Sequence, residues 1–212
     1  MSNYLIHACP ERMWYVERYL IRSMEEQGIG QIDVRCDNDH LGNLESTMRI
    51  FGSMPDNEDG TWHLQDDIII CRNFKKMTEE NDDGVVCGFT ATGSNSGVVN
   101  PDKMWWSFPC IRIPNKIARG CAEWFYSFAK HYAKYYEWNY LGKCDDNFFR
   151  EYLLKNVPDI NVVNMKPNLV DHIDYLLGGS VINQYRGDAQ VRSQYFCDLD
   201  LVKRLEEDLK SE

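Results

Sequence analysis

Apolar residues follow two spacings along the chain, and together these predict strands that alternate with helices. A short apolar run bounded by polar or turn residues, as at residues 4–9, indicates a buried strand. Apolar positions three and four residues apart, as at Val16, Leu20 and Met24, indicate a helix with one buried face, and Gly28 follows where a C-terminal cap belongs. The expected strands are 4–9, 31–36, the apolar lead-in of 61–70, 84–90, 108–113 and 160–164. The expected helices are 11–27, 43–52, 73–81, 115–136, 146–156 and 198–209.

Strands alternating with helices are typical of an α/β fold, in which a sheet is covered by helices on its faces. We therefore expect a mixed, Rossmann-like sheet in a single domain over residues 1–197, followed by an amphipathic helix at 198–212. Residues 91–103, rich in glycine and serine, predict a loop. Ligands bind such sheets at the carboxyl ends of the strands. Three polar groups follow predicted strands in this way: 10–12, 37–39 and 65–67.

The composition argues against a disordered chain and against a membrane-spanning one. Of the 212 residues, 43% are hydrophobic and 13% aromatic, more than a disordered chain carries. No run approaches the roughly 20 apolar residues that cross a bilayer. The first residues lack the basic stretch and apolar core of a signal peptide, so we expect a cytoplasmic protein. The eight cysteines form no CxxC pair, and we interpret them as reduced core thiols.

Charge is distributed unevenly along the chain. The net charge of −10 argues against a protein that binds nucleic acid with its whole surface. Residues 30–83 carry 13 acids against five bases, whereas residues 102–134 carry six bases against two acids. An acidic half beside a basic patch is consistent with a metal site next to an anionic partner, and equally with a solvated surface.

Gln65-Asp66-Asp67 is the first candidate for chemistry. Two adjacent acids after a buried strand place carboxylate oxygens at a sheet edge, and Mg²⁺ or Mn²⁺ is usually held by one or two carboxylates with phosphate oxygens. A solvated turn or a helix cap is the alternative. The segment resembles the DxD-type motif of small, family-2-like glycosyltransferases of the GT-A fold, found in phage and bacterial genomes. The resemblance implies that Asp67 holds the metal, that Gln65, in place of the usual acid, contacts the donor ribose, and that Asp66 assists.

Two loops near the N-terminus match the same family in order. Residues 7–12 resemble the first-strand loop that contacts the donor nucleotide, so Ala8, Pro10 and Arg12 become donor-binding candidates, with a surface arginine as the alternative for Arg12. Asp37, after the second strand, resembles the position that hydrogen-bonds a pyrimidine ring. An ordinary turn residue is the alternative.

Two later segments complete the match. Asp145-Asp146 resembles the motif that supplies the base in inverting members, with Asp146 as the catalytic acid and Asp145 as its partner; a pair of helix caps is the alternative. His172 resembles the histidine that completes the metal site, with a surface or core histidine as the alternative. The segment 178–180 resembles one that folds over the diphosphate, and Arg186 and Arg192 are candidates to reach phosphates from it.

The acceptor side is expected around the basic segment. Trp105 and Trp106 follow the Gly/Ser loop and are candidates to stack on a sugar ring or a nucleobase, with tryptophans capping the sheet as the alternative. Arg112 is a candidate acceptor contact, and Lys116 and Arg119 could follow a phosphate backbone with it. Taken with the resemblance, residues 1–90 form the nucleotide-binding half and residues 91–197 the acceptor half.

The implied activity is transfer of a sugar from a nucleotide-diphosphate sugar, of UDP type, to an acceptor hydroxyl with inversion. Mn²⁺ or Mg²⁺ is the expected cofactor. The acceptor is a glycan, a small molecule or a hydroxymethylated base in phage DNA, in which case the protein acts in the host cytoplasm. No membrane partner is expected, and the oligomeric state stays open. A nucleotidyltransferase and a non-catalytic binding module on the same fold are the alternatives.

Overall fold

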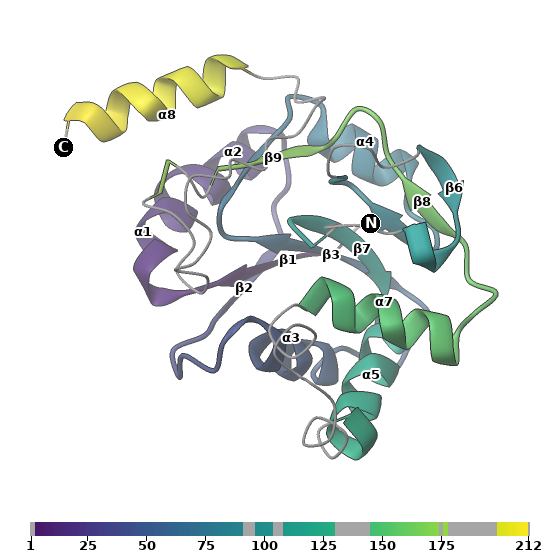
Figure 1. The fold of residues 1–212 in the computed structure, drawn as a ribbon. Coiled ribbons are helices and arrows are strands. Elements are labelled where there is room, and N and C mark those ends of the chain that lie inside the picture. The colour runs from purple at the N-terminus through teal and green to yellow at the C-terminus, as the bar shows by residue number, and fades with distance from the viewer. Residues whose placement is uncertain are drawn as a thin grey trace.

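The computed structural model describes residues 3–90, 96–103, 108–129, 145–173, 176–177 and 199–211. A seven-stranded mixed sheet crosses the middle of the molecule in the order β2-β1-β3-β7-β5-β8-β6 (Figure 1). Its strands are β1 (Asn3–Ala8), β2 (Ile32–Cys36), β3 (Gly60–Gln65), β5 (Val85–Cys87), β6 (Gly97–Val99), β7 (Cys110–Pro114) and β8 (Val162–Asn164). The predicted mixed sheet flanked by helices is confirmed.

Strand direction sets which loops meet. β1 is parallel to β2 and β3, and β5 is parallel to β8, whereas β7 runs antiparallel to both β3 and β5. β1, β2, β3, β5 and β8 therefore share one direction, and β6 and β7 oppose it. The carboxyl ends of the five like-directed strands lie along one edge of the sheet.

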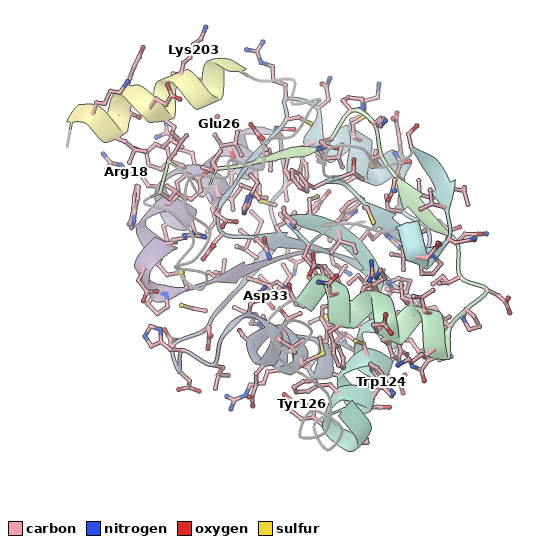
Figure 2. The ribbon with its side chains drawn as sticks, viewed as in Figure 1. Arg18, Glu26, Asp33, Trp124, Tyr126 and Lys203 are labelled. Carbon is pink, nitrogen blue, oxygen red and sulfur yellow. The ribbon has the colours of Figure 1, made fainter. Side chains whose placement is uncertain are left out.

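Helices cover both faces, which buries apolar residues of alternating strand positions on either side (Figure 1). On one face lies a continuous helical segment, Pro10–Glu26, which contains α1 (Met13–Tyr15), a π-helical turn (Val16–Leu20) and α2 (Ile21–Glu26), together with α4 (Phe74–Glu80). The other face carries α3 (Asn43–Gly52), α5 (Asn115–Trp124) and α7 (Asp145–Asn156). Trp124 of α5, labelled in Figure 2, packs its ring 4.9 Å from that of Phe148 in α7.

Each face has its own apolar core. Ile6 of β1 and Trp62 of β3, both fully buried, belong to the core under α1 and α2. Leu5, the neighbour of Ile6, points to the opposite core, where it joins Phe51 of α3. The short apolar runs of the sequence were therefore strands buried on both faces, as in sheets with helices on both sides.

A second, two-stranded sheet was not predicted. β4 (Ile68–Ile70) pairs antiparallel with β9 (Val170–His172), so the apolar stretch 61–70 is broken into two strands in different sheets, with Asp66 and Asp67 between them. The pairing sets Ile68 opposite His172. This pair joins segments about a hundred positions apart, so neither segment shows by itself that it meets the other.

Two further differences concern residues 91–103 and the helix after β7, whereas the terminal helix is as predicted. β6 lies within residues 91–103, which the sequence predicted as a loop. The helix predicted at 115–136 continues from α5 through a π-helical turn, Phe125–Ala129, and its last residues lie outside the described ones. α8 (Leu199–Ser211) confirms the terminal helix and buries Leu205 in the core under α1 and α2. None of the helices in the described part of the chain has the length and hydropathy to span a bilayer.

Candidate functional site

The predicted donor loops gather at the carboxyl-end edge of the sheet. β1 and β3 are neighbours, with His7 opposite Gln65, so the loop after β1 lies beside the turn after β3. The backbone amide of Cys9 donates to Asp66 Oδ2 over 2.7 Å, which ties the two together. Ala8 is buried at the end of β1, Pro10 is exposed in the loop and Gln65 is half-buried at the end of β3.

Arg12 lies between the two acids of the turn. Its Nη1 donates to Asp66 Oδ1 over 3.0 Å and also to Asp67 Oδ2, and the side chain is almost fully buried. Burial and the neighbouring Asp67 raise the pKa of Asp66, against the lowering effect of Arg12. Arg12 is therefore not a surface residue: its guanidinium neutralises part of a buried acidic pair.

Asp67 also contacts His172, the second residue that the resemblance assigns to the metal site. His172 Nε2 lies 3.1 Å from Asp67 Oδ2, although the two residues are distant in sequence. The β4–β9 pairing brings them together, because Ile173 N donates to Asp67 O over 2.8 Å and so fixes the turn against the end of β9. Burial alone would raise the pKa of Asp67, but His172 and Arg12 outweigh it and lower the pKa below its ordinary value.

The second carboxylate oxygen of Asp67 tests whether a metal fits. Oδ1 is buried and has no hydrogen-bond partner among the described residues. A carboxylate oxygen in that position costs free energy unless something binds it. Among the described residues no group of three His, Cys, Asp or Glu is arranged to hold a metal. Asp67 and His172 thus fit a divalent cation that takes its other ligands from phosphate oxygens and water.

Asp37 lies beside the end of β1 and stabilises its own loop. Its backbone amide donates to Ala8 O over 2.9 Å, which continues the β1–β2 pairing. Its carboxylate oxygens accept the amides of Leu41 and Gly42 at 3.1 and 3.2 Å. His40, within the loop, has a φ of 50°, a left-handed conformation uncommon outside glycine. The carboxylate closes the loop that leads into α3 and keeps lone pairs for a ligand.

Asp145 and Asp146 begin α7, and the structure separates their roles. Asp145 is buried and accepts hydrogen bonds from Asn43 Nδ2 at 2.7 Å and Thr47 Oγ1 at 3.1 Å, both on α3. Burial, together with the charge of Asp146, raises the pKa of Asp145 to about 7. Asp146 is only half-buried. Because Asn43 starts the helix that follows the Asp37 loop, both acids lie at the carboxyl-end edge of the sheet.

The structure does not bring Arg112 to this edge. Its guanidinium is buried, contacts Asp82 at 2.6 Å and donates to the carbonyl of Gly84 over 2.7 Å, at the start of β5. The guanidinium also covers Gly60, the first residue of β3. A Cβ added to Gly60 would lie 2.1 Å from Arg112 Cζ. The prediction that Arg112 contacts an acceptor is wrong on this placement, because the side chain neutralises a charge at the opposite edge of the sheet.

The remaining candidates either lie outside the described residues or belong to α5. Outside the described residues are Trp105, Trp106, the segment 178–180, Arg186 and Arg192. Lys116 is exposed beside Glu58, with 2.9 Å between Nζ and Oε1, and Arg119 donates to Met54 O over 3.3 Å. Both lie on α5, which starts after the carboxyl end of β7. Because β7 is antiparallel to β3, α5 starts at the edge of the sheet opposite to the Asp66–Asp67 turn.

A histidine pair, of which His63 is buried and His7 is half-buried, lies beneath the site and was not predicted. His7 Nε2 and His63 Nδ1 are 2.9 Å apart, across β1 and β3, with the ring of Phe51 against both. Burial lowers the pKa of His7 to about 3 and lowers that of His63 well below its ordinary value. Both rings are therefore neutral near pH 7. Each histidine stands within an apolar run, and no local pattern indicates that they meet.

We expect the histidine pair to make stability depend on pH. Neutral His7 is favoured in the fold, so its contribution is complete above pH 6.5 and is lost as the pH falls towards 3. For His7 alone the loss at pH 5 is about 2 kcal/mol. In urea unfolding, the stability of His7→Gln relative to wild type should therefore rise by about that amount from pH 7.5 to pH 5. An unchanged difference would contradict this, and the exposed His40→Gln is the matched control.

No family model and no curated protein matches this chain. A197 from STIV is similar in structure at 13% identity and a TM-score of 0.43, with 81% of this chain and 85% of that chain covered. A putative glucose-1-phosphate thymidylyltransferase from Bacillus anthracis gives 10% identity and a TM-score of 0.41, with 93% and 98% covered. HddC from Yersinia pseudotuberculosis gives 14% identity and a TM-score of 0.31, with 56% of this chain and 79% of that chain covered. TM-scores this low carry no argument, so the fold class rests on the sheet itself.

Proposed function

We propose that this chain is a metal-dependent glycosyltransferase that uses a nucleotide-diphosphate sugar, of UDP type, as its donor. The observation that carries the proposal is the contact between Asp67 Oδ2 and His172 Nε2, which are 3.1 Å apart. The contact lies at the carboxyl ends of the strands, where nucleotides bind α/β sheets. Asp67 Oδ1 is buried and has no hydrogen-bond partner in the described part of the chain, which supports a cation as its partner. The donor diphosphate would supply its remaining ligands.

The donor side follows from the loops around this pair. Asp67 and His172 would hold Mn²⁺ or Mg²⁺, and a bound cation neutralises charge on the leaving diphosphate. Gln65, at the end of β3, would hydrogen-bond the ribose. Asp37, with lone pairs to spare at the end of β2, would meet the base. Ala8 and Pro10 would line the nucleotide from the β1 loop, whose shape Asp66 fixes through the Cys9 amide.

Asp146 would act as the general base. It stands half-buried at the start of α7, where it can accept a proton from the acceptor hydroxyl as that oxygen attacks the anomeric carbon. The bond from the anomeric carbon to the diphosphate breaks as the new one forms, which inverts the configuration. The acceptor is a glycan, a small molecule or a hydroxymethylated base in phage DNA, and Trp105 and Trp106 are proposed to stack on it.

A nucleotidyltransferase is the second candidate, because the same carboxylate–imidazole pair would bind metal and nucleotide there too. The position of Arg12 favours it specifically: a buried basic side chain after the first strand reaches the acidic turn. That enzyme class joins a nucleoside triphosphate to a phosphorylated partner. The two candidates differ in the nucleotide that binds, and that difference can be measured without knowing the acceptor.

We expect a UDP-sugar together with Mn²⁺ to raise the melting temperature. A ligand at a hundred times its Kd stabilises the fold by about 2.7 kcal/mol, which shifts the melting temperature by several degrees in a chain of this size. A thermal-shift panel of nucleotide sugars and nucleoside triphosphates, each with and without Mn²⁺, is the test. Stabilisation by triphosphates alone would favour the nucleotidyltransferase, and no stabilisation by any nucleotide would overturn both candidates.

A further inference from the structure

Arg12 reaches the acidic turn to which the proposed metal would bind. Its Nη1 contacts Asp67 Oδ2, the same oxygen that faces His172 Nε2 at 3.1 Å. With 6% of its surface exposed, Arg12 reaches these acids from within the protein. Two groups that carry or can carry positive charge thus share one carboxylate oxygen, while Asp67 Oδ1 has no hydrogen-bond partner among the described residues.

Arg12 is anchored independently of Asp67. Its backbone amide donates to Cys9 O over 3.1 Å, and the Cys9 amide in turn donates to Asp66 Oδ2 over 2.7 Å. The guanidinium also keeps a 3.0 Å bond to Asp66 Oδ1. The contact with Asp67 can therefore be lost while the loop and the Asp66 contact remain.

The charge of Arg12 affects how tightly Asp67 can hold a metal ion. The two carboxylates and one guanidinium sum to one negative charge, and a divalent cation on Asp67 would stand beside the guanidinium in a site with little water. Like charges at such separations repel strongly where the effective dielectric constant is low. The phosphates of a donor would bring negative charge to both cations, so metal and donor together relieve a repulsion that the metal alone would meet.

We propose that Arg12 is a positioning residue that acts as a built-in counter-ion of Asp67 and keeps metal affinity low until a donor diphosphate is bound. The inference rests on the proposed function, since it assigns the metal to Asp67 and a diphosphate to the donor. Its consequence is that metal and diphosphate bind as a unit: each strengthens the other by the same factor, because the coupling of two ligands is reciprocal.

The test measures Mn²⁺ binding alone, from the loss of the electron paramagnetic resonance signal of the free ion. Arg12→Gln should bind Mn²⁺ about tenfold or more tightly than wild type without nucleotide, because the competing charge is gone. Adding UDP should strengthen Mn²⁺ binding in wild type and do so much less in Arg12→Gln. Arg12→Lys, which keeps the charge, should restore weak binding of Mn²⁺ alone and most of its coupling to UDP.

Matched controls separate this effect from loss of charge or of fold. Arg112→Gln removes an equally buried arginine, ion-paired with Asp82 at the opposite edge, and should leave Mn²⁺ affinity at the wild-type value. If Arg12→Gln alone does not fold, Arg12→Gln with Asp66→Asn removes a cation and an anion together. That double variant should bind Mn²⁺ about tenfold or more tightly than Asp66→Asn.

The outcomes keep the two proposals apart. Unchanged or weaker Mn²⁺ binding in Arg12→Gln, relative to wild type, would overturn the role of Arg12. So would tighter binding that survives Asp67→Asn in the same chain, since the metal would then lie elsewhere. A thermal-shift panel in which no nucleotide sugar binds would overturn the proposed function, even if the competition between Arg12 and Mn²⁺ were observed.

Discussion

Asp67→Asn should lower the rate of donor hydrolysis by about a thousandfold or more at saturating UDP-sugar and Mn²⁺. Asparagine keeps the shape of the side chain but removes the charge that a divalent cation needs, and Asp67 is one of only two protein ligands in the proposed site. Lewis-acid stabilisation of the leaving diphosphate is worth several kcal/mol, and each 1.36 kcal/mol is tenfold in rate. The measurement is release of UDP with water as acceptor, which requires no knowledge of the natural acceptor.

Asp82→Asn is the matched control for that loss. Asp82 pairs with the buried Arg112 at 2.6 Å, as Asp67 pairs with the buried Arg12, but it does so at the opposite edge of the sheet. The Asp82 side chain is 33% exposed against 10% for Asp67, so Asp82→Asn should destabilise the fold by less while leaving the hydrolysis rate near that of wild type. If Asp67→Asn kept more than about a tenth of the activity, the metal role of Asp67 would be contradicted.

The helices and the long strands were predictable because their information is local. Residues 43–52 were predicted as a helix and form α3 over the same range, since apolar side chains at helical spacing bury one face whatever they pack against. β1 follows from a short apolar run, and in β2 apolar and charged residues alternate, so that both patterns are also local. β6 was missed because it lies in a segment rich in glycine and serine, which predicts a loop. The β4–β9 pair was missed because it joins segments about a hundred residues apart.

The candidate site was predictable only in its residue types. Acids after a strand indicated a cation site, and the resemblance supplied His172 as the partner that lies near Asp67. That Arg12 would bond to both acids could not be derived, because 54 positions separate it from Asp66 and its own neighbourhood predicts only the start of a helix. Arg112 was misjudged for the related reason that a basic residue in a basic segment does not reveal a buried ion pair with Asp82.

The two acids of α7 show how an adjacent pair can serve different ends. Asp145 is held by Asn43 and Thr47 of α3, so it fixes how α7 lies against α3. Asp146, one residue on, accepts the amide of Asn147 at 2.7 Å and is half-buried. Asp145 thereby positions Asp146, and a change at each acid should move a different measurement.

Asp146→Asn should lower the turnover number for UDP release by about a hundredfold or more, with little change in KM for the donor. Removing a general base costs about 10² to 10⁴ in rate, because the attacking hydroxyl, here that of water, keeps its proton in the transition state. The donor lies on the far side of the reacting carbon from this base, so its affinity should be retained. A change in KM alone would show that Asp146 binds substrate and does not act as the base.

Asp145→Asn should instead change stability, and its pH dependence gives the sign. Burial raises the pKa of Asp145 to about 7, so the folded state favours the protonated acid and loses stability as the pH rises from 3.8 through 7. Asparagine imitates the protonated form. The variant should therefore gain stability relative to wild type with rising pH, on the order of 2–4 kcal/mol by pH 8 in urea unfolding. If Asp145→Asn instead lowered the rate as much as Asp146→Asn and gave no such gain in stability, Asp145 would be the base. The substitution would then have removed the proton acceptor of the reaction and would not have relieved a buried charge.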